Sequence, residues 1–254
     1  MTVKFLGTGT SQGVPVIACN CSVCTSPNKN DKRLRSSVLI ALGDRNIVID
    51  TGPDFRYQML REHVTHLDAV LFTHSHKDHV AGLDDVRAFN RQQGGAVDIY
   101  GTKDVHEALQ REFYYAFSAK RYPGVPVLTL HEITTEPFHL FGHEIIPIEV
   151  MHYMMPVLGF RIGDFTYITD AKTIEESQVE KIIGSKVLVV NALQRDAHIS
   201  HFTLDEAVAF AQRIGAEQTY LTHISHRLGR HDEVEAELPR GIHLAYDRLQ
   251  LTIS

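Results

Sequence analysis

The chain has 254 residues and a formal net charge of −6 at pH 7. Its hydrophobic fraction of 43% and charged fraction of 22% lie near globular averages, which excludes an intrinsically disordered chain. The negative charge excludes the broad basic surface that sequence-independent nucleic-acid binding requires. We therefore expect a single domain over residues 1–254, with a small molecule rather than a nucleic acid as its partner.

The start of the chain lacks the pattern of a secretory signal. Met1 is followed at once by a strand-like run at residues 3–6, with no basic start and no apolar stretch. Further along, no uninterrupted apolar run is long enough to span a bilayer. We therefore expect a cytoplasmic protein without membrane contact.

Strands and helices are predicted to interleave along the chain. Strand patterns occur at residues 3–6, 37–42, 46–50, 67–73, 97–100, 127–131 and 186–191, and residues 139–170 are predicted to be strands joined by tight turns. Helical periodicity occurs at residues 80–93, 104–117, 174–183 and 203–214. Because many strands neighbour one another in sequence while helices lie between and after them, we expect two packed sheets covered by helices.

A histidine-rich run follows the buried strand at residues 67–73. His74, His76, Asp78 and His79 place four potential metal ligands within six residues. In an extended segment, residues two apart point the same way, so His74 and His76 can bind one ion. Asp78 and His79, where the chain turns into a helix, can reach a second ion, and the mixed nitrogen and oxygen ligands suit Zn²⁺, Mn²⁺ or Fe. The alternative interpretation is a solvated histidine-rich turn.

This H-x-H-x-D-H run resembles the signature of the metallo-β-lactamase superfamily. The resemblance implies an α/β fold of the αββα type, in which two packed mixed β-sheets are flanked by helices and the metals lie at one edge. It also implies three later ligands, each after a strand, and His152, Asp170 and His223 occupy such positions. A lone His or Asp is more often an ordinary hydrogen-bonded group. Here the order and the strand-end positions favour ligands.

The implied centre holds two divalent ions, Zn or Mn. By the resemblance, His74, His76 and His152 hold one ion, Asp78, His79 and His223 hold the other, and Asp170 bridges both. Two cations that share a water lower its pKa and stabilise charge on an attacked phosphoryl or acyl centre. We therefore expect a metal-dependent hydrolase, with Asp78 among its catalytic residues.

A second metal site is predicted at the cysteines. Cys19, Cys21 and Cys24 lie in one loop, too close together and too odd in number for a disulfide framework. Thiolate-rich sites with one further histidine are typical of structural zinc, and His226, just beyond His223, is the candidate for the fourth ligand. The alternative is three reduced, free cysteines.

Several segments together narrow the resemblance. They are the Gly/Thr-rich residues 7–15, the C-x-C-x-x-C cluster, residues 222–226 and residues 245–247. They are similar to the phosphoribosyl 1,2-cyclic phosphate phosphodiesterases of bacterial phosphonate degradation, in which such a cysteine cluster holds a structural zinc. The resemblance implies hydrolysis of a small, cyclic ribose phosphate-like diester by attack of metal-bound hydroxide.

His201 is the remaining candidate for a catalytic residue. It precedes Thr203 and Glu206, which form a predicted capping box at the start of a helix. Similar enzymes place a histidine at the mouth of the site here, so we predict that His201 contacts phosphate and protonates the leaving alkoxide. The alternative is a surface residue ahead of the helix.

Three other functions stay open. A transfer-RNA 3′-processing nuclease shares the metal run, although the acidic charge and the lack of a basic or Gly/Pro-rich insertion count against it. A lactonase or thioesterase is the carboxylic-ester alternative. A zinc-stabilised binding module is the non-enzymatic one, and the complete ligand set argues against it. The sequence leaves open whether the protein forms a homodimer.

Overall fold

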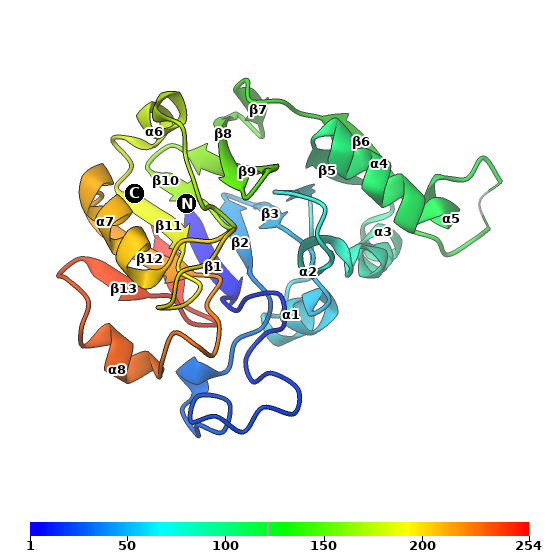
Figure 1. Ribbon diagram of the computed structural model, residues 1–254. Helices are drawn as coiled ribbons and strands as arrows, with labels where there is room; N and C mark the ends of the chain where they lie inside the picture. Colours follow the sequence, from blue (N-terminus) through cyan, green and yellow to red (C-terminus); the bar gives the residue numbers. More distant parts are fainter. Residues whose placement is uncertain (121, 254) are drawn as a thin grey trace.

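The chain folds into two packed β-sheets with helices on their outer faces. The computed structural model describes residues 1–120 and 122–253. Within them, each sheet has seven strands, and the helices lie on both sides of the paired sheets (Figure 1). The predicted αββα architecture is therefore confirmed. Among the described residues, no helix combines the length and the apolar character that crossing a membrane requires.

Both sheets mix parallel and antiparallel strands. In order across the first sheet, the strands are β14 (Gln250–Thr252), β1 (Thr2–Gly7), β2 (Ser37–Leu42), β3 (Arg45–Ile49), β4 (Ala69–Leu71), β5 (Val97–Gly101) and β6 (Leu128–Glu132). Across the second sheet they are β13 (Ile242–Leu244), β12 (Gln218–Thr222), β11 (Val187–Asn191), β10 (Phe165–Tyr167), β9 (Met155–Ile162), β8 (His143–His152) and β7 (Phe138–Leu140). The chain thus forms most of one sheet before it begins the other, and only β14 returns to the first.

Helices from the first half of the chain cover the first sheet, and those from the second half cover the second sheet. The former are α1 (Phe55–Arg61), α2 (Lys77–Val80), η2 (Leu83–Val86), α3 (Arg87–Gln93), α4 (Lys103–Glu112) and α5 (Tyr114–Phe117). The latter are α6 (Glu176–Ile182), α7 (Leu204–Ile214) and α8 (His231–Glu235), and the short η1 (Lys29–Asp31) lies in the N-terminal loop.

The strands are apolar on both faces because both faces are buried. In β3, Ile47 and Ile49 pack in the core between the sheets, whereas Val48 faces the helices of the first half. This alternation follows from the two-residue period of a strand. It explains why the central strands carry continuous apolar runs rather than an apolar and polar alternation.

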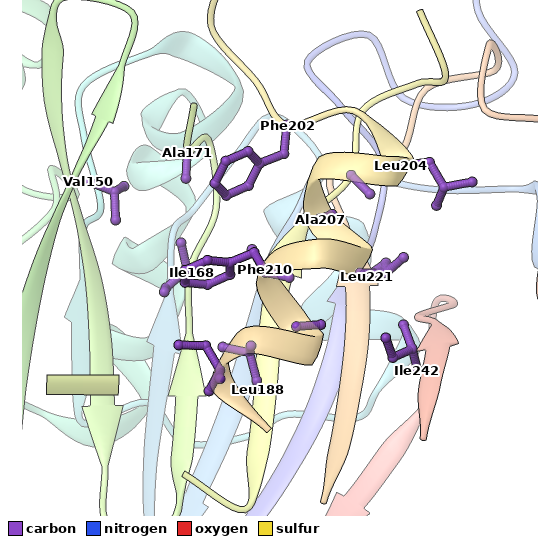
Figure 2. Close-up of a cluster of buried hydrophobic side chains, with 14 of the residues drawn as sticks. Val150, Ile168, Ala171, Leu188, Phe202, Leu204, Ala207, Phe210, Leu221 and Ile242 are labelled. Atoms are coloured by element: carbon purple, nitrogen blue, oxygen red, sulfur yellow. The ribbon is translucent and has the colours of Figure 1, made fainter. Parts of the chain in front are cut away.

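Helix α7 seals the outer face of the second sheet. Ala207 and Phe210 of this helix lie in one buried cluster with Leu188 of β11 and Leu221 of β12, and Figure 2 shows the Phe210 ring beside Ile168. The helix begins at Thr203, whose hydroxyl accepts a hydrogen bond from the backbone N–H of Glu206, while the Glu206 carboxylate accepts one from the N–H of Thr203. The predicted capping box is therefore confirmed.

Two predicted helices are wrong in detail. The helix expected at residues 80–93 is broken at Gly82, because this glycine packs directly against the backbone near α1. A Cβ on Gly82 would lie 2.2 Å from the Gly52 carbonyl oxygen and 2.7 Å from the Phe55 Cβ. The helix expected at residues 104–117 is likewise split, at Phe113, into α4 and α5. Helices α1 and α8 were not predicted from the sequence.

Candidate metal centre

The predicted ligands follow strands that end at one edge of the sandwich. Strands β3 and β4 are parallel, and Asp50 and residues 73–79 follow them. In the second sheet, β10 and β12 run parallel through β11, and Asp170 and His223 follow them. Strand β8 runs the same way, since it is antiparallel to β9 and β9 is antiparallel to β10, and it ends at His152. The backbone N–H of Leu158 donates to the Thr73 carbonyl and joins the two sheets there.

Asp170 lies at the centre of the resulting cluster. Its Oδ2 is 3.3 Å from His79 Nε2 and 3.3 Å from His223 Nδ1, and its Oδ1 is 3.8 Å from His201 Nδ1. The Thr169 hydroxyl donates a 2.6 Å hydrogen bond to Oδ2. Three groups have potential ligand atoms within 4.8 Å of one another: His74, His79 and Asp170; Asp78, His79 and His223; and His152, Asp170 and His201.

His76 lies on the outer side of this cluster. Its ring centroid is 4.7 Å from that of His74 and 5.2 Å from that of His152, although it belongs to none of the three close groups. The structure thus brings all seven predicted ligands together. Because His201 joins His152 and Asp170 in one group, it is an additional donor rather than a distant surface residue. The ligand role of each residue stays a prediction.

The backbone is held in an unusual conformation at three of these positions. Asp50, Asp170 and His223 have φ angles of 64°, 59° and 55°, in the left-handed region that side-chain-bearing residues rarely adopt. Such conformations cost of order 1–3 kcal/mol each and persist only where the surroundings impose them. The strand ends therefore aim these side chains at one point at the expense of local backbone energy.

Carboxylates and imidazoles in the cluster shift one another's pKa values. For His79, burial opposes protonation, yet the Asp50 and Asp170 carboxylates outweigh burial and raise its pKa well above the usual value. For Asp170, burial alone would raise the pKa, but His223 and His79 hold it well below the usual range. Burial, reinforced by His79, lowers the pKa of His74 well below its usual value. Without a metal, His79 is therefore protonated beside the ionised Asp170 carboxylate, whereas His74 is neutral. A divalent cation at this place would take over the role of the His79 proton.

Asp50 is a site residue that the sequence analysis missed. Its carboxylate is fully buried, accepts hydrogen bonds from the Thr73 N–H at 2.9 Å and the Thr73 hydroxyl at 2.8 Å, and lies 2.7 Å from His79 Nδ1. This contact fixes the tautomer and orientation of His79, so that Nε2 faces Asp78 and Asp170. In the sequence, the only signal is an Asp-Thr-Gly at a strand end, which also indicates an ordinary turn.

His201 is held within the cluster by its neighbours. Its ring stacks on His223 with centroids 4.9 Å apart and lies 4.5 Å from the His152 ring. Burial, followed by the nearby His223, lowers the pKa of His201 to about 3. At neutral pH the imidazole is therefore uncharged and has a single ring N–H to donate.

The donor atoms of the cluster fit a bound cation. His74 Nε2 is buried and has no hydrogen-bond partner among the described residues, whereas His79 Nε2 lies 3.2 and 3.3 Å from the carboxylates of Asp78 and Asp170. An unpartnered buried polar atom is costly, and a divalent ion would remove that cost by accepting the nitrogen lone pair. Nitrogen and carboxylate oxygen together suit zinc and manganese.

The three cysteines gather around His226. Its Nδ1 lies 3.2, 3.4 and 3.5 Å from the sulfur atoms of Cys19, Cys21 and Cys24. The Cys24 N–H donates to the Cys21 sulfur and lowers the pKa of Cys21 to about 6, whereas burial raises the pKa of Cys24 to about 11. Three thiolates this close repel one another, so a divalent cation is what would hold them deprotonated together.

Comparison with known proteins agrees with this geometry. The β-lactamase superfamily domain matches residues 45–224, which is more than half of the chain and includes all seven predicted ligands of the dinuclear centre. The chain belongs to the metallo-β-lactamase superfamily. The superfamily prediction is confirmed, and the fold of this superfamily implies divalent metal ions at the site. The cysteine cluster and His226 lie outside the matched segment.

Three relatives match the whole of this chain, but the share of their own length that is matched differs. A solved structure described as a new diphosphatase from the PhnP family is 40% identical, with a TM-score of 0.94, and the match covers 100% of this chain and 98% of that one. Zn²⁺-bound PqqB from Methylobacterium extorquens has the same fold, with a TM-score of 0.81 at 20% identity and full coverage of both chains. A protein named octanoyltransferase from Porphyromonas gingivalis is 39% identical over an alignment of 256 positions, which covers 100% of this chain and 52% of that protein. The chain thus spans about half the length of this curated relative.

Proposed function

We propose that the protein hydrolyses a small phosphodiester of the cyclic ribose phosphate type. The observation that carries the proposal is the buried Asp170 carboxylate, which lies within 4.8 Å of nitrogen atoms of His74 and His152, from one predicted ligand set, and of His79, from the other. One carboxylate between two groups of nitrogen donors suits a pair of ions, and ion pairs of this kind occur in hydrolases that act at phosphorus. The 40% identity to a diphosphatase supports the same class of reaction.

The residues present would hold three ions in all. His74, His76 and His152 would hold one active-site ion, Asp78, His79 and His223 the other, and Asp170 both; Cys19, Cys21, Cys24 and His226 would hold a structural zinc. When bound, active-site zinc or manganese supplies Lewis acidity that lowers the pKa of water and stabilises negative charge on a phosphoryl group.

The side chains of the protein itself have separate tasks in this proposal. Asp78 stays ionised, because His79 outweighs the effect of burial and lowers the pKa of Asp78. Asp50 keeps the His79 ring oriented through their 2.7 Å contact. In the free protein the His201 imidazole is uncharged, and a bound phosphoryl group would raise its pKa again through its negative charge. The resulting imidazolium would contact the phosphoryl group and pass its extra proton to the departing alkoxide.

Two competing activities follow from the names of relatives. Diphosphate hydrolysis is favoured by the solved diphosphatase and would also proceed at phosphorus. Hydrolysis of an octanoyl thioester is the carboxylic-ester alternative, motivated by the relative named octanoyltransferase, although this chain corresponds to only 52% of that protein. The transfer-RNA nuclease alternative stays outside the proposal, since the net charge is −6.

The proposal is tested by steady-state kinetics of the metal-reconstituted protein on matched substrates. The panel contains a cyclic ribose phosphate, a linear diphosphate, a phosphomonoester, a lactone, octanoyl thioester and a transfer-RNA precursor. We expect the highest kcat/KM for the cyclic phosphodiester, because a site that clamps phosphoryl oxygens gains little from a planar ester. A preference for the lactone or the thioester would overturn the proposal, and a preference for the diphosphate would replace it with the diphosphatase activity.

The role of His201 is tested by changing the leaving group. General-acid assistance contributes about 10²–10⁴-fold and matters most when the leaving oxygen is strongly basic. We expect His201→Ala to slow hydrolysis of an alkyl phosphodiester by about 10²-fold or more, and that of a p-nitrophenyl phosphodiester far less. An equal loss on both esters would show that His201 only binds or positions the substrate.

Four further expectations stay predictions: a location in the cytoplasm, a small-molecule partner, the absence of nucleic-acid binding, and a single domain over residues 1–254.

We also propose that any homodimer leaves the edge of the sheets at the cluster accessible to substrate. We propose that the substrate approaches the cluster from the side of His76 and His152, which line a cavity of about 430 Å³.

A further inference from the structure

The β8–β9 hairpin places a tyrosine in a backbone conformation that tyrosine rarely adopts. Strand β8 ends at His152 and β9 begins at Met155, and these two residues are paired, so Tyr153 and Met154 form a two-residue loop. Tyr153 has a φ angle of 58°. Tight hairpin loops require positive φ angles and normally use Gly, Asn or Asp there. The tyrosine ring is 57% exposed, so core packing does not account for its presence at this costly position.

Tyr153 borders the cavity that leads to the predicted metal ligands. The cavity has a volume of about 430 Å³, and His76 and His152 line its inner side. Its outer wall includes Tyr153, Met154 and Ile199, which are 57%, 76% and 65% exposed. None of these three outer side chains carries a charge. A cavity of this size lies in the range of pockets that hold small ligands.

The hairpin on one side of the cavity and the loop with Ile199 on the other contact each other, and both carry residues of the predicted metal centre. His152 Nδ1 lies 2.9 Å from the Ser200 carbonyl oxygen, which joins the end of β8 to the loop that carries Ile199. The next residue of this loop, His201, contacts the His152 ring at a centroid distance of 4.5 Å. A group held against Tyr153 and Ile199 therefore lies next to the place where the phosphoryl group is expected.

We propose that Tyr153, Met154 and Ile199 form a binding surface for a flat, uncharged ring in the non-reacting part of the substrate, of the nucleobase type. The inference rests on the proposed function and adds the substrate class that this site prefers. An exposed tyrosine face stacks on a ring, and the methionine thioether makes favourable contacts with ring edges. An acyl chain requires an enclosing apolar channel, whereas this wall is more than half exposed.

The test compares three substrates that differ only at the position of the ring. They are adenosine 2′,3′-cyclic phosphate and the methyl and hexyl ribosides of the same cyclic phosphate, with the monoester product measured by phosphorus NMR. Base stacking on an aromatic side chain is worth about 1–3 kcal/mol, so we expect the wild-type protein to favour the adenosine substrate over the methyl riboside by about tenfold or more. Tyr153→Leu should remove this preference by raising KM, with kcat unchanged, and Tyr153→Phe should retain it.

Tyr114→Leu is the matched control, because Tyr114 is also exposed, at 71%, and lies on α5. Equal losses on the adenosine and methyl substrates in Tyr153→Leu, or a wild-type preference for the hexyl riboside, would overturn the inference.

A second experiment, which compares the calorimetric binding of adenosine monophosphate with that of ribose 5-phosphate, separates this inference from the proposed function. Tighter, Tyr153-dependent binding of adenosine monophosphate without hydrolysis of any cyclic phosphate would contradict the function and leave the ring surface standing. Hydrolysis of a cyclic phosphate together with equal binding of the two ligands would contradict the ring surface and leave the proposed function standing.

Discussion

Asp170→Ala is expected to abolish phosphodiester hydrolysis, with a loss in kcat of about 10³-fold or more. Asp170 is the carboxylate that lies within 4.8 Å of ligand atoms from both predicted ion sites, His74 and His152 of one and His79 of the other. Its removal takes negative charge from between the predicted ion sites and leaves the neighbouring imidazoles without their common partner. The measurements are kcat on a cyclic phosphodiester and metal content per chain, with circular dichroism to establish folding.

Asp170→Asn is the isosteric companion, since it keeps the shape of the side chain and removes only the charge. We expect it to bind the active-site ions far more weakly than the wild type and to share most of the loss in kcat. Asp164→Asn, at a partly buried hairpin position away from the cluster whose carboxylate pairs with Lys186, is the control and should leave both quantities unchanged. A folded Asp170→Ala protein with near wild-type kcat would show that Asp170 does not join the two ions.

Cys21→Ser is expected to remove one tightly held zinc per chain and to lower the thermal midpoint by about 10 °C. The Cys21 sulfur lies 3.4 Å from His226 Nδ1, and its lowered pKa favours the thiolate that zinc binds. Structural zinc sites contribute their binding free energy to folding, and in a chain of this size each kcal/mol shifts the midpoint by about 2–4 °C. Zinc content and a melting curve measure both effects.

Loss of this zinc should affect the active site by shifting the backbone that carries His223, since the thiolates themselves take no part in the reaction. The Thr10 N–H donates to the Ile224 carbonyl at 3.1 Å, and the Thr10 hydroxyl lies 3.1 Å from His223 Nε2, so the N-terminal loop bears on the segment that carries His223. Ser22→Ala, at an exposed position in the same loop, is the matched control. An unchanged zinc count in Cys21→Ser, or rapid alkylation of all three thiols in zinc-replete protein, would show that the cysteines are free.

The sequence predicted those site residues whose position follows from chain order. His74, His76, Asp78 and His79 form one local run, and His152 ends a clear apolar strand, so strand-end position was informative for each. Parallel pairing then brings such ends to the same edge of the sheets. For the same reason, the layered architecture could be predicted from the succession of strands and helices.

Features that depend on tertiary contacts could not be predicted in this way. Asp50 acts on His79 across two adjacent strands, and nothing near Asp50 in the sequence shows that His79 will lie 2.7 Å away. The break at Gly82 arises because the Gly52 backbone approaches it, which overrides the local helical periodicity. The positive φ angle of Tyr153 is equally invisible in a run of His, Tyr and Met.

The most direct measurement is a metal titration of the chelator-stripped protein, with hydrolysis of a cyclic ribose phosphate as the readout and metal counted in the same samples. His74 Nε2, which is buried and has no hydrogen-bond partner among the described residues, and the central Asp170 predict that activity is absent without added metal. We expect it to reach its maximum when each chain holds two zinc or manganese ions in addition to the zinc at the cysteines. Full hydrolysis by the stripped protein, or a plateau with a single ion bound beyond the cysteine site, would contradict a dinuclear phosphodiesterase.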